Sequence, residues 1–331
     1  MIDYSIIIRT MGKAGKKYEV LLESISKLVP QPKEVIVVLP EGYSLPKERL
    51  GGETFYFSKK GMVTQRLYGI YVCKSKYALV CDDDISFDSD FVNKLYSPIE
   101  QGVAKISSGP LLSYLPSEGF MSFLYAITGA AIPKLNCRGK YISILPTTGY
   151  SYYRKLKKKH GENLIAESLP WTCFFGEIEA IKKIRLHEEK WLELNGYAAM
   201  DDQTMFYKAY LRGIKTVIVT DALYEHLDAK TSRTVTAEIA YPMEFNRYIF
   251  WHRFIYSMDS GGKKLWDILC INYYLIMKSI YNRYRFFQKQ LDKKSLQLKK
   301  QAIKDAKKYI KNSEYLNLPN VMEKRCKNEQ I

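Results

Sequence analysis

The chain has 331 residues, of which 47% are hydrophobic and 26% are charged. This composition is ordinary for a globular protein and excludes wholesale disorder, a collagen and a polytopic membrane protein. The length exceeds the roughly 100–200 residues of a usual domain, which predicts one large α/β domain or a domain with an appendage. The 51 Lys and Arg residues outnumber the 35 Asp and Glu residues, and the net charge of +16 suggests a polyanionic partner: a nucleic acid, a phosphorylated substrate or an acidic membrane.

The positive charge is concentrated toward the C-terminus. Residues 244–331 hold 19 basic and 8 acidic side chains, a net charge of +11, which leaves +5 for residues 1–243. The six cysteines show no Cys-x-x-Cys pair and no regular spacing, so we expect neither a zinc site nor a disulfide framework. Reduced thiols, the lack of a signal peptide and apolar stretches shorter than the roughly 20 residues of a spanning helix favour a cytoplasmic protein.

The first eighty residues alternate between strand and helix patterns. We expect strands over residues 4–8, 35–39, 55–57 and 77–81, and helices over residues 18–28 and 63–71. Such βαβ units imply a parallel sheet whose ligands gather at the carboxyl ends of the strands. The strand that ends at Cys81 is followed at once by Asp82, Asp83 and Asp84, so these acids lie where a ligand is expected.

The middle of the chain is less regular. After a helix near Phe91 and a short strand near Ile106, residues 134–170 are rich in Gly, Pro, Thr, Tyr and Lys, which predicts a long loop or lid rather than core. Its basic run, residues 154–159, is either a solvated charge cluster or a cover over a diphosphate. Ordered elements return as strands over 173–175 and 216–219, a helix from about residue 177, and a helix over 202–212.

From Phe245 onward the sequence predicts amphipathic helices, because aromatic and aliphatic residues recur beside Lys and Arg over residues 245–254, 265–287 and 289–311. Two interpretations remain open. The helices lie on an anionic membrane surface, or residues 245–287 pack on the preceding domain while the Lys-rich end is solvated.

Two acidic segments are candidates for chemistry. The three adjacent carboxylates of Asp82, Asp83 and Asp84 repel one another, and a divalent cation such as Mg²⁺ or Mn²⁺ would relieve this repulsion and bridge to a diphosphate; a solvated turn is the alternative. Asp201 and Asp202 begin a helix, where a carboxylate can act as a general base or simply cap the helix. His226 follows a strand, and a lone His is more often structural than a ligand.

The order of these segments resembles that of the inverting nucleotide-sugar glycosyltransferases of family 2. Gly61 is followed five residues later by Arg66 and eight residues later by Gly69, as in a helix of that family. Residues 201–213 are similar to the helix that carries the family's acidic pair, and residues 245–248 resemble the aromatic and Arg/Asn segment that often follows the catalytic domain. The resemblance covers about residues 4–255.

The resemblance implies a GT-A fold, a Rossmann-like mixed and mainly parallel sheet flanked by helices. Residues 1–243 would form the catalytic domain, with a nucleotide-sugar half at 1–100 and an acceptor half at 101–243 that contains the lid 134–170. Residues 244–331 would form a basic helical extension that contacts a membrane.

The resemblance also assigns roles to the acids. Asp82 would contact the nucleotide ribose, Asp84 would bind the metal, and Asp83 would lie close by. Asp202 would be the catalytic base, with Asp201 as the second choice.

Other residues would complete the donor site. His226 would contact the metal or the diphosphate, while Arg9, Thr10 and Arg66 would lie in the nucleotide pocket. Glu41 would replace the family's base-reading Asp pair. The sequence departs from the family pattern there, and also in its Asp-Asp pair and its Gln-Arg-Leu segment at 65–67.

The expected activity is the inverting, metal-dependent transfer of a sugar from a nucleoside-diphosphate sugar to a saccharide acceptor. The acceptor would be a lipid-linked saccharide of a surface polysaccharide pathway, and the enzyme would work at the cytoplasmic face of the inner membrane. Trp171 is either an acceptor contact or a packed side chain.

A sugar nucleotidyltransferase is an alternative function, for which residues 11–17 are a weak candidate for the triphosphate-binding loop. A nucleic-acid-binding protein is favoured by net charge alone, and since no recognition motif accompanies that charge, we expect no nucleic-acid partner.

Overall fold

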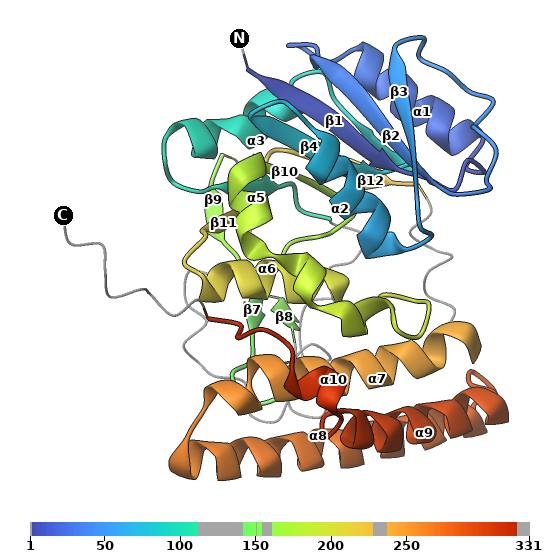
Figure 1. Cartoon of the computed structure of the whole chain (residues 1–331), viewed down its shortest axis with the longest axis vertical. Coiled ribbons are helices and arrows are strands. Elements are labelled where there is room, and N and C mark those ends of the chain that lie inside the picture. Colours follow the sequence, from blue (N-terminus) through green and yellow to red (C-terminus); the bar gives the residue numbers. More distant parts are fainter. Residues whose placement is uncertain (1, 112–141, 150, 154–160, 228–236, 323–331) are drawn as a thin grey trace.

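The computed structural model describes residues 2–111, 142–149, 151–153, 161–227 and 237–322 (Figure 1). An eight-stranded sheet lies at one end of the molecule, with the strand order β3-β2-β1-β4-β10-β6-β11-β9. These strands are β1 (Tyr4–Arg9), β2 (Glu34–Pro40), β3 (Glu53–Ser58), β4 (Tyr77–Asp82), β6 (Ile106–Ser108), β9 (Asn163–Ile165), β10 (Cys173–Glu177) and β11 (Thr216–Val219). The first four are parallel, β10 is antiparallel to β4 and β6, β11 is parallel to β6, and β9 is antiparallel to β11.

Helices cover both faces of the sheet because its strands are apolar on both sides. In β1, Ile6 and Ile8 face the cluster that contains α1 (Lys16–Ser26) and α3 (Phe91–Glu100), whereas Ile7 faces the opposite cluster. That opposite cluster contains α2 (Met62–Val72), α5 (Ile178–Ile184) and α6 (Asp201–Leu211). This alternation is the arrangement that parallel βαβ units produce.

Two antiparallel pairs form small sheets separate from the main one. β5 (Ile85–Phe87) pairs with β12 (Tyr224–His226), and β7 (Ile142–Ile144) pairs with β8 (Ser151–Tyr153). Short 3₁₀ helices span Leu186–Glu188, Lys190–Glu193 and Tyr256–Met258. The β5–β12 pair brings the segment after β4 beside the segment after β11, although about 140 residues separate them in the sequence.

The C-terminal helices form the end of the molecule opposite the sheet (Figure 1). They are α7 (Ala237–Phe254), α8 (Gly261–Phe287), α9 (Lys293–Tyr309) and α10 (Ser313–Leu316). Buried side chains of α7, among them Phe245 and Phe250, belong to the same apolar cluster as α2, α5 and α6. The boundary predicted at residue 243 therefore falls inside a helix that completes the core of the preceding residues.

Buried ion pairs reinforce this attachment. Glu244 of α7 contacts Lys278 of α8 and Lys299 of α9, each at 2.9 Å, and Glu189 contacts Arg253 of α7 and Lys208 of α6. The two lysines lower the pKa of Glu244 to about 2, against the effect of its burial. No helix within the described ranges is both long and apolar enough to cross a membrane.

The predicted elements up to β4 are present, each within two residues of its expected ends. The prediction of a loop without core residues over 134–170 is wrong where that segment is described. β9 pairs with the sheet, and Ile142, Ile144 and Leu169 are buried. Short strands and Gly- or Pro-rich turns look alike in a single sequence, which explains the error. The basic run at 154–159 lies outside the described residues.

Candidate active site

The predicted donor residues lie at one edge of the sheet. Arg9 ends β1, Glu41 follows β2, and Asp82 ends β4, where it lies beside Arg9 in the strand register. Glu41 is exposed, whereas Thr10 and Asp82 are buried. Because parallel strands end at the same edge, residues from separate parts of the sequence are brought together there, as predicted.

Arg66 connects the two acidic segments. This side chain is only 1% exposed; its Nη2 lies 2.5 Å from Oδ1 of Asp82, and its Nη1 lies 3.8 Å from Oδ2 of Asp201. Its guanidinium also lies over the Trp171 ring, 5.0 Å from the centroid. Burial lowers the pKa of Arg66, while Asp82 and Asp201 act in the opposite direction. A buried cation thus holds Asp82 and Asp201 at one site.

The adjacent acids Asp82, Asp83 and Asp84 have different partners. Asp82 also forms an ion pair with Arg9, whose Nε lies 3.3 Å from Oδ1 of Asp82. Asp83 accepts a hydrogen bond of 2.5 Å from the hydroxyl of Thr10. Burial raises the pKa of Asp83, and the Thr10 hydrogen bond opposes this rise. The repulsion that led us to expect a cation is therefore relieved in large part by side chains of the protein.

Asp84 lies beside His226. Its Oδ2 is 3.1 Å from Nε2 of the histidine, and the β5–β12 pairing holds the two residues together. The amide of Leu227 also donates to the carbonyl oxygen of Asp84 at 2.8 Å. Within the described residues, no group of three or more His, Cys, Asp and Glu side chains is arranged to hold a metal ion. At this point a carboxylate oxygen of Asp84 and an imidazole nitrogen of His226 lie in direct contact.

Asp201 and Asp202 form the first turn of α6. The residue before the helix is Met200, in the left-handed conformation, so neither acid is the cap itself. The Oδ1 atom of Asp201 accepts a hydrogen bond from the amide of Asp202, and that of Asp202 accepts one from the amide of Gln203. Burial, with the adjacent charge of Asp202, raises the pKa of Asp201 to about 7.

The pKa of Asp202 is also raised, mainly by burial. The hydrogen bond from the Gln203 amide and the positive charge of Arg247 oppose that rise. Acids with raised pKa values at the start of a helix in a cavity are candidates for proton transfer.

A cavity of about 370 Å³ opens between these residues. Its lining includes Asp82, Arg66, Asp201, Asp202, Trp171 and Arg247. Thr10, Glu41, Asp83, Asp84 and His226 are not among its lining residues. No role was predicted for Arg247, which comes from α7 beyond the predicted catalytic domain, although the aromatic and Arg/Asn segment at 245–248 pointed to it.

A larger hollow of about 620 Å³ lies between α2 and residues 181–193. Its Glu193 accepts hydrogen bonds from the amides of Val63 and Thr64 at the start of α2, and its Glu189 is paired with Lys208 and Arg253. Since these carboxylates already serve the fold, the smaller cavity is the better candidate for chemistry.

Comparison with known proteins supports the architecture. No protein-family model and no curated protein matches the sequence. Among solved structures, that of S. aureus TarS is similar over 93% of this chain and 49% of that chain, with 13% identity and a TM-score of 0.51. The fragment TarS 1–349 in complex with UDP-GlcNAc matches 92% of this chain and 80% of that chain, with 14% identity and a TM-score of 0.49.

The fold is of the GT-A type. The mainly parallel sheet flanked by helices, with its helical C-terminal extension, is confirmed. The identity to TarS is too low to extend the likeness beyond the fold, so membership of family 2 remains a prediction.

Proposed function

We propose that the protein is a glycosyltransferase that moves a sugar from a nucleoside diphosphate to an acceptor hydroxyl. The observation that carries the proposal is the cavity in which Arg66 joins Asp82, at the end of a parallel strand, to the Asp201–Asp202 pair. A donor held at the strand end would have a carboxylate facing its reactive carbon. TarS has been crystallised with UDP-GlcNAc, which agrees with this class of donor.

In this proposal the donor nucleotide lies along the sheet edge formed by Arg9, Thr10, Glu41, Asp82 and Asp83. Asp82 accepts a hydrogen bond from the ribose, as the family resemblance implies. The ion pairs from Arg9 and Arg66 fix its carboxylate in position, so that little reorganisation is needed when the donor binds.

Asp84 and His226 fit a divalent cation that the donor helps to bind. The protein would supply Oδ2 of Asp84 and Nε2 of His226, which lie 3.1 Å apart. Mg²⁺ commonly uses one or two protein ligands and takes the others from phosphates and water. When bound, the cation would stabilise the charge of the departing diphosphate.

Asp202 is the proposed base. Its carboxylate takes the proton of the acceptor hydroxyl, the oxygen bonds to the anomeric carbon, and the bond to the diphosphate breaks with its electron pair on the diphosphate. Attack opposite the leaving group inverts the anomeric configuration. Asp201 suits the role less, because one of its oxygens accepts the Asp202 amide and the other is inaccessible to solvent next to Arg66. Arg247 lowers the pKa of Asp202 and so favours its ionised, basic form.

The acceptor would be a lipid-linked saccharide of a surface polysaccharide pathway. It would approach the cavity between Trp171 and Arg247. Arg247 comes from α7, so the C-terminal helices complete the proposed acceptor side of the cavity.

The Asp202→Asn variant tests the base. General-base assistance contributes about 10²–10⁴ in rate, so turnover of a nucleotide sugar should fall by that factor. A panel of nucleotide sugars with Mn²⁺, read by thermal shift, first identifies the donor, and the variant should bind that donor as the wild type does. Wild-type turnover in Asp202→Asn would refute the assignment, and stabilisation by nucleoside triphosphates alone would favour a nucleotidyltransferase.

A further inference from the structure

Helix α8 carries a continuous row of exposed apolar side chains. At about 100° per residue, eight of them fall within an arc of about 100° on the helix surface. This α8 stripe consists of Leu265, Trp266, Leu269, Tyr273, Ile276, Ile280, Tyr284 and Phe287. Leu269 is 62% exposed and Phe287 is 78% exposed. The stripe runs about 33 Å along the helix.

The opposite side of α8 is fixed to the protein. Cys270, Ile271 and Tyr274 are buried, Tyr274 lies 5.9 Å from the guanidinium of Arg247, and Lys278 pairs with the buried Glu244. These contacts determine the rotation of the helix about its axis. The stripe is therefore held outward, away from the core.

Such a surface is unusual for an isolated protein. Single exposed apolar residues are common, but contiguous large patches mark interaction sites. The stripe also contains Trp266, Tyr273 and Tyr284, whose rings have an apolar body and a polar edge. Trp and Tyr are enriched at the boundary between lipid chains and headgroups for this reason.

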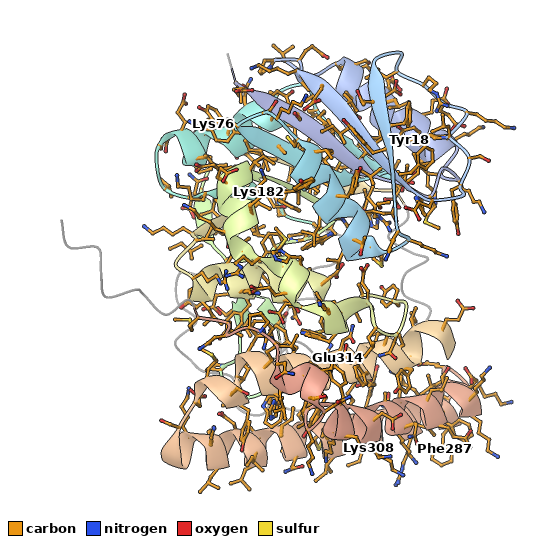
Figure 2. The ribbon with its side chains drawn as sticks, in the orientation of Figure 1. Tyr18, Lys76, Lys182, Phe287, Lys308 and Glu314 are labelled. Carbon is orange, nitrogen blue, oxygen red and sulfur yellow. The ribbon has the colours of Figure 1, made fainter. Side chains whose placement is uncertain are left out.

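The exposed charged side chains of residues 261–311 are mostly basic. Between residues 261 and 311, ten Lys and Arg side chains are exposed, against one exposed acid, Asp292. Many of them belong to α9, which lies with α8 at the end of the molecule away from the sheet. Figure 2 shows Phe287 of α8 and Lys308 of α9 at that same end.

We infer that the α8 stripe, with the exposed lysines of α9, docks on a bilayer that contains anionic lipid. The apolar side chains enter the headgroup boundary while the cations meet the lipid phosphates. A second copy of the chain fits this face less well, because a symmetric pair would bring the same positive charges together. The helix lies on the membrane and does not span it, in keeping with its buried polar face.

This docking does not depend on the proposed chemistry, because it can be measured without a donor or an acceptor. It has a structural consequence for that proposal, however. The membrane helix packs through Tyr274 and Lys278 against α7, the helix that carries Arg247 into the cavity. A bound bilayer would thus hold the cavity in a fixed orientation toward a lipid-linked molecule.

Co-sedimentation of the full chain with vesicles tests the inference. Vesicles of phosphatidylcholine with 30% phosphatidylglycerol should bind the protein, with a partition coefficient that falls as salt is added, whereas pure phosphatidylcholine should bind it far less. Leu269→Asp and Ile276→Asp should each weaken binding by about tenfold or more, since each removes an apolar side chain from the interface. Lys300→Glu with Lys304→Glu should weaken binding by at least about fivefold for each position.

Tyr71→Asp is the matched control. Tyr71 is 77% exposed on α2, so this variant places a carboxylate on a different exposed helix and should bind vesicles as the wild type does. Because all the substituted side chains are exposed, circular dichroism should show unchanged folding. Wild-type binding by Leu269→Asp and Ile276→Asp would overturn the inference, as would failure of the wild type to bind the anionic vesicles. A wild-type dimer that both stripe variants convert to monomers, with vesicle binding retained, would instead identify the stripe as a dimer interface.

Discussion

Asp201→Asn should stabilise the protein, and the gain should be larger at pH 8 than at pH 5. Burial and the charge of Asp202 raise the pKa of Asp201 from 3.8 to about 7. An acid whose pKa is higher in the folded state binds more protons there, so its ionisation opposes folding as the pH rises from about 4 to 7. Asparagine removes this titration while its side-chain oxygen can still accept the Asp202 amide.

The magnitude follows from these two pKa values. Linkage gives a destabilisation by Asp201 of about 4 kcal/mol at pH 8 and about 2 kcal/mol at pH 5. The effect of the substitution should therefore differ by about 2–3 kcal/mol between the two pH values. Loss of the 3.8 Å contact with Arg66 reduces the gain at pH 8, but Arg66 keeps its closer partner Asp82.

Urea unfolding of the wild type and the variant at both pH values, followed by tryptophan fluorescence, measures this difference. Titration of all other groups cancels in the comparison, because the repulsion between Asp201 and Asp202 is already contained in the raised pKa of Asp201. Asp90→Asn, at an exposed aspartate paired with Lys94, is the control and should show a small effect at either pH. An Asp201→Asn variant that loses more stability at pH 8 than at pH 5 would show that the acid is ionised and stabilising in the folded protein.

Two further substitutions test the packing and the proposed metal site. Gly69→Ala should destabilise the protein by about 1–3 kcal/mol in urea unfolding, because the new Cβ would lie 2.4 Å from Cγ2 of Ile7. Gly262→Ala is the control and should be neutral or slightly stabilising, because open space surrounds this position in α8. Equal effects of the two substitutions on the free energy of unfolding would contradict this packing argument. Asp84→Ala should weaken binding of the nucleotide donor in calorimetry with Mn²⁺ present and change little with Mn²⁺ absent, whereas unchanged binding under both conditions would remove Asp84 from the metal site.

The sequence predicted the parallel half of the sheet because its signals are local. Runs such as Ile6–Ile8 are apolar on both faces, and the intervening helices repeat their apolar residues at helical spacing. The carboxyl ends of β1, β2 and β4 then had to meet at one edge, which brought Arg9, Glu41 and Asp82 to that edge. The short strands β5, β7, β8, β9 and β12 were missed, since three residues carry too little periodicity to distinguish a strand from a loop.

Both the acids of the candidate site and the basic residues Arg9, Arg66 and His226 were predicted, but the pairing between them was not. Asp82 could be singled out because adjacent carboxylates are costly without a partner, and Asp202 because it begins a predicted helix that resembles the one carrying the family's acidic pair. Which side chain relieves that cost depends on packing: Arg66 is buried between Asp82 and Asp201, and His226 reaches Asp84 across a strand pair. The same limit applies to the C-terminal helices, whose composition fits both membrane contact and packing on the domain.

The sequence by itself thus determined the order of elements, the edge where the acids gather and the basic character of the C-terminal helices, because local periodicity and charge fix these properties. Only the tertiary structure decided that α7 completes the core and contributes Arg247 to the cavity, that Asp82, Asp83 and Asp84 have separate partners, and that one side of α8 is packed while the other is exposed. Each of these depends on how distant segments approach in space, where burial and the position of a partner charge decide the state of every side chain.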